Sequence, residues 1–496
     1  MNILLVYPEF LVTFWSWKHL LRLISKKAAF PPLGLLTVAA MLPEQWNKKL
    51  VDLNILQLTD EDIKWADYVF VSAMITQSDS AERIIARCKE LGVAVVLGGP
   101  ILEMGCDKFP SVSHFMVGEV ENTFSKFLED LRLGKARQIY LPGDFPDLVL
   151  SPIPLWDIIN HGDYACMLVQ YGRGCPHRCT FCNEAALNGR VPRAKSPTQF
   201  LRELDAIYQI GFKGPIMLAD ANFIGDKRKV REMLPHLIKW QQNREYPFSF
   251  TVEVDITLAD DHDLMDQMVL AGFKSVFLGL ETPNKASLIE CRKTHNASRD
   301  MLACVKRIHN HGLLAMSGFI LGFDNDGPDI FDKHIKFYWQ AGIVFPMAGV
   351  LQAPLRTELF DRLNKEGRLL AATTGNNTDS RPNFIPKMPL DALVTGYKRV
   401  MGVVYSPKKY YERICVFLRE YNSAKKVGEK LTAKDLKVFV VSIWVIGFFG
   451  GLKTSYYYWK TLLLAFFKYR RAFPEAVTLQ VYGWHFHRIA KSIQKS

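Results

Sequence analysis

The sequence lacks the marks of a secreted or disulfide-stapled protein. Its opening residues, MNILLVYPEF, show neither the charged region, the apolar run nor the small-residue cleavage site of a signal peptide, and they predict a buried first strand instead. Its nine cysteines are an odd number, spaced without the even framework of a disulfide scaffold. We therefore expect a protein of the reducing cytoplasm.

The sequence also has no long hydrophobic run. Its most apolar stretch, VFVVSIWVIGFFGGL at residues 438–452, contains three glycines and lies between Lys437 and Lys453. A membrane-spanning helix needs roughly twenty apolar residues, and this stretch has about fifteen. A buried core helix is favoured. An interfacial helix and a span stay open, so peripheral contact with the inner face of the membrane is an alternative to a purely cytoplasmic location.

Negative charge is scarce, because 50 Asp and Glu residues stand against 62 Lys and Arg and give a formal net charge of +12. This bias favours phosphate-bearing ligands or an anionic membrane surface. The basic residues are dispersed, and the sequence has no helix-turn-helix, zinc-finger or RNA-binding signature. We therefore expect no nucleic-acid partner.

The first part of the chain, residues 1–135, alternates short apolar segments with helical patterns. The whole chain of 496 residues, 49% of them hydrophobic, can form two to four domains. The predicted strands of this first part are residues 3–8, 49–55, 68–74, 94–100 and 114–119, and its predicted helices include residues 33–42 and 79–92. The alternation predicts a doubly wound parallel sheet, whose ligands bind beyond the carboxyl ends of the strands.

A polar, proline-bearing linker at residues 136–160 precedes a second alternating region at residues 161–360. Its predicted strands are residues 167–171, 215–220, 248–256, 275–281, 315–324 and 348–353, and its predicted helices are residues 197–212, 227–243, 260–272, 298–311 and 329–341. These β/α units predict a partial parallel barrel with its site at the C-terminal ends of the strands. Residues 361–496 predict a helical region with aromatic and basic residues, so the fold class is α/β with a helical C-terminal region.

A loop directly after the first barrel strand reads GRGCPHRCTFCNE. It carries Cys175, Cys179 and Cys182 in the spacing C-x3-C-x2-C. A structural zinc site needs four ligands, and the loop offers only His177, between two of the cysteines, as a fourth. A [4Fe-4S] cluster fits better, since three thiolates leave one iron open to a small molecule.

With Phe181 before its last cysteine, the loop resembles that of the radical S-adenosylmethionine superfamily, and the resemblance extends over residues 165–355. It implies that the open iron binds the amino and carboxylate groups of S-adenosylmethionine. It further implies that an electron from the cluster cleaves the sulfonium to release a 5′-deoxyadenosyl radical. A reductant such as flavodoxin or ferredoxin would supply that electron.

Other positions of the superfamily can be matched one by one. Asp220, after the second strand, stands where the family often has Gly-Gly-Glu to meet the ammonium group, although the glycines are absent. Glu253, in the third strand, stands where a polar residue reaches the ribose. The fifth strand carries Gly318-x-Ile320-x-Gly322, which resembles the adenine-contacting pattern. A helix-capping Asp220, a surface or ion-paired Glu253 and strand glycines needed for packing are the alternative interpretations.

The N-terminal sheet resembles the cobalamin-binding domain of one class of this superfamily. Ser72-x-Met74 after the third strand and Gly98-Gly99 after the fourth match two of its three marks. The third mark, an Asp-x-His-x-x-Gly loop, is absent, because residues 30–34 read FPPLG. The resemblance implies cobalamin bound without a protein histidine, or a domain that has lost the cofactor. Ordinary turn chemistry is the alternative for the two glycines.

Three further sequence segments narrow the resemblance to one subgroup of the superfamily. GRVPRAKSPTQFLRELDAIYQIGF, DANFIGDKRKV and LADD are similar to a subgroup that includes hopanoid C-2 methylases, and this similarity covers residues 1–420. The sequence thus predicts a radical S-adenosylmethionine enzyme that is a cobalamin-dependent C-methyltransferase for an apolar small molecule, such as a lipid, isoprenoid or tetrapyrrole. An oxidoreductase or cyclase without methyl transfer, and a non-catalytic iron–sulfur protein, are the alternatives.

Overall fold

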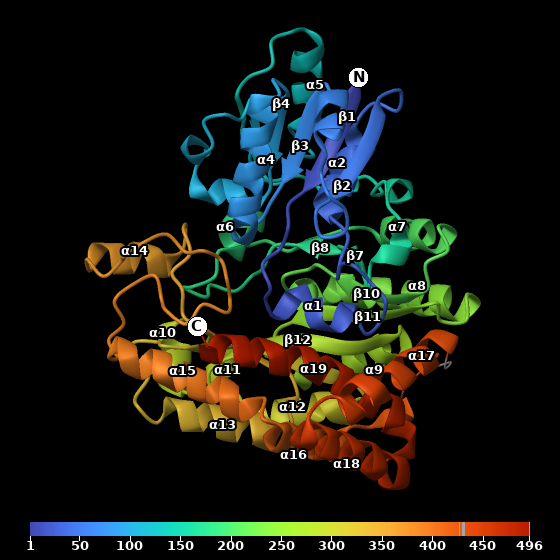
Figure 1. Cartoon of the computed structure of the whole chain (residues 1–496), viewed down its shortest axis with the longest axis vertical. Coiled ribbons are helices and arrows are strands. Elements are labelled where there is room, and N and C mark those ends of the chain that lie inside the picture. Colours follow the sequence, from blue (N-terminus) through green and yellow to red (C-terminus); the bar gives the residue numbers. More distant parts are fainter. Residues whose placement is uncertain (426, 429–431, 496) are drawn as a thin grey trace.

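We describe a computed structural model of the chain, which covers residues 1–425, 427–428 and 432–495. The N-terminal sheet lies at one end of the molecule, a second sheet occupies the middle, and the C-terminal helices cover the other end (Figure 1). The fold class predicted from the sequence is confirmed.

The N-terminal sheet is parallel throughout and has the strand order β2-β1-β3-β4-β5-β6. Its strands are β1 (Asn2–Tyr7), β2 (Asn47–Asp52), β3 (Tyr68–Ser72), β4 (Ala94–Gly98), β5 (His114–Met116) and β6 (Ile139–Tyr140). One face packs against α3 (Asp60–Trp65) and α4 (Ser78–Glu90), and the other against α2 (Leu33–Met41) and α5 (Phe124–Arg132). Covering on both faces explains why β1, β3 and β4 are almost wholly apolar.

The second sheet is also parallel, and its strands follow the chain in the order β7-β10-β11-β12-β13-β14. They are β7 (Met167–Val169), β10 (Gly214–Leu218), β11 (Phe248–Val254), β12 (Phe273–Glu281), β13 (Leu314–Leu321) and β14 (Pro346–Val350). The helices of this part are α6 (Glu184–Asn188), α7 (Pro197–Gln209), α8 (Lys227–Asn243), α9 (His262–Leu270), α10 (Lys285–Glu290), α11 (Thr294–Ala297), α12 (Met301–Asn310), α13 (Ile330–Ala341) and α14 (Glu358–Lys365). The predicted partial barrel is therefore confirmed, with β7 and β14 as its edge strands.

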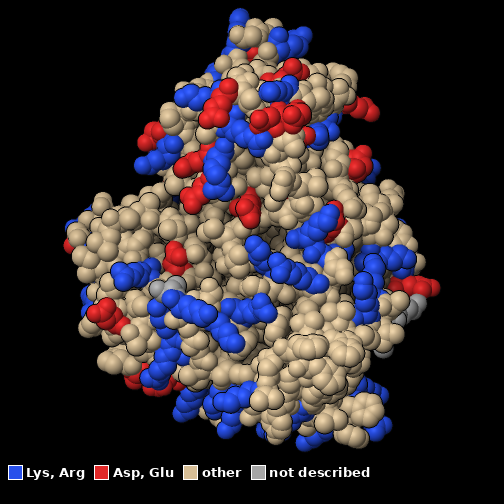
Figure 2. Space-filling view, viewed as in Figure 1, with Lys and Arg blue, Asp and Glu red and all other residues tan. Residues whose placement is uncertain are grey.

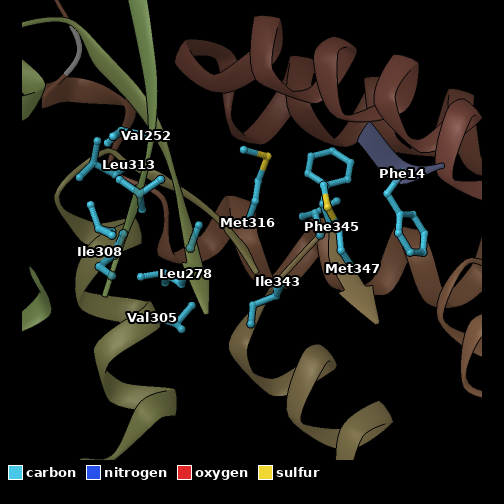
Figure 3. Packing of buried hydrophobic residues seen from close by; sticks show 14 of the residues in the cluster. Phe14, Val252, Leu278, Val305, Ile308, Leu313, Met316, Ile343, Phe345 and Met347 are labelled. Carbon is cyan, nitrogen blue, oxygen red and sulfur yellow. The ribbon is translucent and has the colours of Figure 1, made fainter. Parts of the chain in front are cut away.

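The C-terminal helices are α15 (Leu390–Val404), α16 (Pro407–Glu420), α17 (Ala433–Ser442), the π-helical turn η11 (Ile443–Phe448), α18 (Leu452–Lys468) and α19 (Phe473–Lys495). The last of them joins three parts of the chain. Phe486 of α19 stacks on Phe345, just before β14, at 5.2 Å between ring centroids, and on Phe14 at 5.8 Å. Figure 3 shows Phe14 near the strand that carries Met347, so the start of the chain shares the core of the barrel.

Two differences from the expectations concern short or mixed segments. Strand β6 lies inside the predicted linker, and its two residues are too few to produce a periodic pattern. The apolar stretch at residues 438–452 is divided, since Ser442 and Ile446 are buried while Phe449 and Leu452 are exposed. In the described part of the chain, no helix combines the length and the apolar character needed to cross a membrane. The predicted domain boundaries stay a prediction.

Candidate cofactor site at the barrel mouth

The cysteine loop begins in a small antiparallel ladder between β8 (Gly172–Arg173) and β9 (Arg193–Ala194). Gly174 follows with φ +91°, and a Cβ there would lie 2.8 Å from the carbonyl oxygen of Val191. Only glycine fits this position without strain. The amide of Cys175 then donates to the carbonyl of Gly189 at 3.1 Å. The Gly-Arg-Gly sequence thus sets the direction in which the first cysteine enters the loop.

The far side of the loop is fixed to the segments beyond β12 and β14. The amide of Thr180 donates to the carbonyl of Cys291 at 3.1 Å, and its carbonyl accepts from the amide of Leu359 at 2.8 Å. The Phe181 ring packs edge-on against Phe323, at 6.2 Å between centroids. The aromatic residue that marks the motif in sequence is therefore a packing anchor for the loop.

The three loop thiols are free, and their side chains are neither deeply buried nor remote from charge. Cys175 and Cys179 are partly exposed and Cys182 is exposed. Burial raises the pKa of Cys175 and of Cys179, and the positive charge of Lys293 opposes that rise at both. Among the described residues, no three His, Cys, Asp or Glu side chains are gathered as a ready metal site. The fit to a cluster rests on donor chemistry, namely three thiols on one loop beside a cation.

Asp220, predicted to meet the ligand, lies beneath the loop. Its carboxylate accepts hydrogen bonds from the amides of Tyr171 at 2.8 Å and Gly172 at 2.6 Å. The side chain is buried, and burial raises its pKa to about 7. The structure thus places Asp220 where it holds the backbone that leads into the cysteines.

Glu253 lies on β11 and is partly buried. Burial raises its pKa to about 7, and the neighbouring carboxylates of Glu184 and Glu281 add to the rise. Within the described residues its carboxylate has no protein hydrogen-bond partner or ion pair, so the ion-paired alternative receives no support. A carboxylate in this setting can accept hydrogen bonds from ligand hydroxyls.

A buried ion pair at the end of β12 was not anticipated from the sequence. The Lys293 ammonium donates to the Glu281 carboxylate, and both side chains are nearly inaccessible. Glu281 has φ +62°, a strained value for a residue with a side chain. Gly279 leaves room for the pair, because a Cβ there would lie 2.5 Å from Lys293 Nζ. Lys293 is the cation whose charge reaches the loop thiols.

His177 is also held by the barrel. Its Nε2 lies 2.9 Å from Asp255 Oδ2, just after β11, and its ring stacks on His295 at 3.9 Å between centroids. Asp255 accepts a second hydrogen bond from Asn222 Nδ2 at 2.9 Å. The histidine inside the motif therefore fixes the loop to the barrel, and nothing in its local sequence indicates the distant partner.

The glycine-rich pattern of β13 lies against packed side chains. A Cβ on Gly318 would lie 3.2 Å from the Phe277 ring, and Gly322 has φ +101° with its amide donating to Asp326 at 3.0 Å. Ile320 packs in the cluster that contains Phe181. These contacts support the interpretation that the glycines serve packing. The adenine-binding role stays a prediction.

The predicted cobalamin residues meet at the carboxyl edge of the N-terminal sheet. Ser72 ends β3, Gly98 ends β4, and Gly99 follows with φ +92°. A Cβ on Gly99 would lie 2.9 Å from Ser72 Oγ and 2.7 Å from the carbonyl oxygen of Ala73. The two strand ends are thus in direct contact, and only glycine allows their approach.

This edge of the sheet faces the cysteine loop. Asn183, next to the last cysteine, donates to Glu103, which lies in the turn that follows Gly99, at 2.8 Å. Arg173, before the first cysteine, forms ion pairs with Glu119 at 2.6 Å and Glu121 at 2.8 Å. The N-terminal sheet therefore contacts both ends of the loop.

Glu119 is central to this contact, because Arg193 of β9 also pairs with it, at 2.5 Å. We expect Glu119→Gln to lower the free energy of unfolding by about 3 kcal/mol, since two guanidinium groups would lose a buried counter-ion. Urea unfolding measures the change, and hydrogen exchange of residues 172–194 should quicken. Glu129→Gln is the control, because Glu129 pairs with Lys126 at the surface and its loss should leave the midpoint unchanged. An equal midpoint for both variants would contradict the role of Glu119.

Comparison with known proteins agrees with this arrangement. Residues 169–338 match the family model described as the radical SAM superfamily, and residues 357–496 match a domain of unknown function, DUF4070. An uncharacterized methyltransferase of Synechocystis is 39% identical over 449 residues, which cover 90% of this chain and 84% of the relative. Hopanoid C-2 methylase of Rhodopseudomonas palustris is 33% identical over 474 residues, covering 93% and 89%.

Among solved structures, the cobalamin-dependent radical enzyme OxsB has a similar fold, with a TM-score of 0.62 and 14% identity, and the match covers all of this chain and 80% of OxsB. The open parallel barrel with its three-cysteine loop is that of a radical S-adenosylmethionine enzyme, and a parallel N-terminal sheet is set against it. Within this class, the chain belongs to the family of methyltransferases that includes hopanoid C-2 methylase.

Proposed function

We propose that the chain is a cobalamin-dependent radical S-adenosylmethionine C-methyltransferase with a [4Fe-4S] cluster. The observation that carries the proposal is the contact between the two predicted cofactor edges, made by Glu103 and Asn183. A methyl carrier and a radical generator must act on the same substrate carbon, so their sites have to adjoin.

Each predicted residue has a role in this proposal. Cys175, Cys179 and Cys182 hold the cluster, which supplies an electron for the cleavage of S-adenosylmethionine when it is bound. Asp220 fixes the two amides at the start of the loop. Glu253 accepts hydrogen bonds from the ribose hydroxyls.

The remaining residues position the nucleoside and the methyl carrier. Gly318, Ile320 and Gly322 form the surface on which the adenine lies. Ser72, Gly98 and Gly99 form the edge of the N-terminal sheet on which cobalamin would lie, and residues 30–34 offer it no histidine.

The substrate is an apolar small molecule in this proposal. A relative that is 33% identical is named hopanoid C-2 methylase, and that name supports the assignment. A small reductant such as flavodoxin or ferredoxin supplies the electrons. Methylation of a lipid carbon without an activating group requires removal of its hydrogen atom.

The stoichiometry of the reaction tests the proposal. One S-adenosylmethionine, with an electron from the reductant, yields methionine and 5′-deoxyadenosine, which carries away the substrate hydrogen. A second donates its methyl group as a methyl-cation equivalent and leaves as S-adenosylhomocysteine, because one molecule cannot supply both fragments. Joining that methyl group to the substrate radical takes a second electron from the reductant, so each turnover uses two electrons. We expect equal amounts of 5′-deoxyadenosine, S-adenosylhomocysteine and methylated product, measured by mass spectrometry with deuterium-labelled methyl groups and a total lipid extract as acceptor.

Two outcomes would contradict the proposal in different ways. Formation of 5′-deoxyadenosine without S-adenosylhomocysteine would indicate an oxidoreductase or cyclase. Methylated lipid without 5′-deoxyadenosine would indicate a nucleophilic carbon and no substrate radical.

A further inference from the structure

The segment α17–η11–α18 forms a helical hairpin, which we call the C-terminal hairpin (residues 433–468). Its inner side is firmly packed. Tyr458 and Ser442 share a hydrogen bond at 2.7 Å between their hydroxyls, and Trp459 Nε1 donates to the carbonyl of Gly447 at 3.0 Å. Ile446, Tyr458 and Leu462 are buried. The hairpin is thus a defined element of the fold, with its outer side fixed in place.

The outer side of the hairpin is apolar. At its tip, between η11 and α18, Phe449 is 77% exposed and Leu452 is 93% exposed. The other exposed large side chains of the hairpin are Leu436, Val440, Trp444, Phe448, Tyr456, Leu463, Phe466 and Phe467. On α18 the positions 452, 456, 463 and 467 recur at intervals of four and seven residues, which places them on one helix face. Exposed aromatic and aliphatic side chains in such number mark an interaction surface.

Basic residues predominate along most of this hairpin. Between Asp435 and Glu475 the sequence has no acidic residue and six basic ones, which are Lys437, Lys453, Lys460, Lys468, Arg470 and Arg471. In Figure 2 the end of the molecule over α18 presents a broad uncharged area with lysines and arginines at its border. An apolar tip with Trp and Tyr inside a cationic border is complementary to an anionic lipid surface.

We propose that the C-terminal hairpin is a monotopic membrane anchor that inserts its tip into the interface of an anionic bilayer. The tip enters the acyl boundary with Phe448, Phe449 and Leu452, and the lysines and arginines contact lipid headgroups. Charge complementarity favours lipid over a second copy of the chain, since two copies would bring their cationic borders together. The inference does not depend on the catalytic assignment.

Vesicle flotation of the full chain tests the anchor. We expect the protein to float with vesicles of phosphatidylglycerol and to remain in the dense fraction with vesicles of phosphatidylcholine. In about 1 M salt, where the Debye length falls to about 3 Å, most of the bound protein should be released. The triple variant Phe448→Ser, Phe449→Ser and Leu452→Ser should lower the partition coefficient by at least about tenfold.

Matched variants separate the anchor from a general effect of surface polarity. Leu56→Ser, Leu133→Ser and Val149→Ser remove exposed apolar side chains at the other end of the chain and should leave flotation unchanged. Lys453→Gln with Lys468→Gln should lower binding by about tenfold, whereas Lys108→Gln with Lys135→Gln should not. Circular dichroism and iron content confirm that each variant is folded.

Three results would overturn the inference. Absence of flotation with phosphatidylglycerol would exclude lipid binding. Equal flotation of the tip variant and its control would place lipid binding elsewhere. A vesicle-free dimer that the tip variant converts to a monomer, seen by sedimentation velocity, would identify a second copy as the partner of this surface.

Discussion

Replacement of Cys175, Cys179 and Cys182 with alanine together is expected to leave a folded apoprotein without a cluster. After anaerobic reconstitution the parent chain should hold about four irons, and the variant only background iron. The three thiols are the free donors of one loop, and that loop retains its other anchors, which are the Asp220 cap, the Thr180 hydrogen bonds and the Phe181 packing. Iron and sulfide analysis gives the content, and formation of 5′-deoxyadenosine should fall to background with it.

Cys291 offers a matched control for this experiment. It is buried beside the loop, its carbonyl accepts the hydrogen bond from Thr180, and its thiol points to the carbonyl of Leu288. Cys291→Ala should therefore retain the full iron content, as should Cys106→Ala and Cys166→Ala. Loss of iron in any of these three variants would show that the cluster has a different set of ligands.

Lys293→Met is expected to lower the free energy of unfolding by about 3–5 kcal/mol, because it leaves the buried Glu281 carboxylate without its counter-ion. The methionine retains the volume of the side chain, so the loss measures charge more than packing. The variant should also load less iron, since the only change beside the three thiolates is the removal of a positive charge that stabilises them. Urea unfolding of the apoprotein and iron analysis measure the two effects.

The double variant Lys293→Met, Glu281→Gln separates the two effects. It removes both charges, so it should recover most of the stability but not the iron loading. Lys333→Met is the control, since Lys333 pairs with Asp329 on the surface, and its midpoint should not change. A single Lys293→Met variant as stable as the parent would contradict a buried charge pair.

The sequence alone was sufficient to predict the features that depend on a local pattern of residues. Strand alternation predicted both sheets, and the position of the cysteine loop directly after the first barrel strand predicted its place at the barrel mouth. Contacts such as Arg173 with Glu119 and Lys293 with Glu281 were not predictable. Their partners lie far apart in the chain or in irregular segments, and neither residue stands in a periodic pattern that would reveal the other.

For two residues at or near the cysteine loop, the structure shows contacts that the sequence did not indicate. Asp220 was expected at the ligand, which stays a prediction, and its carboxylate accepts hydrogen bonds from the amides of Tyr171 and Gly172. His177 was considered only as a metal ligand, and it pairs with Asp255. Both side chains act on the backbone of the loop, and such roles depend on which strand ends meet in space.

The contact of the N-terminal aromatic residues with α19 determines when folding of this part of the chain can be completed. Phe14 and Trp17 pack against His485 and Phe486, which are synthesised much later than they are. Strands β1 to β6 can form while the rest of the chain is still on the ribosome, because N-terminal domains fold as units during translation. The segment that contains Phe14 and Trp17 has to wait, with its aromatic side chains exposed, until α19 has emerged. Chaperone demand during synthesis should therefore fall on this early segment and persist until α19 is available.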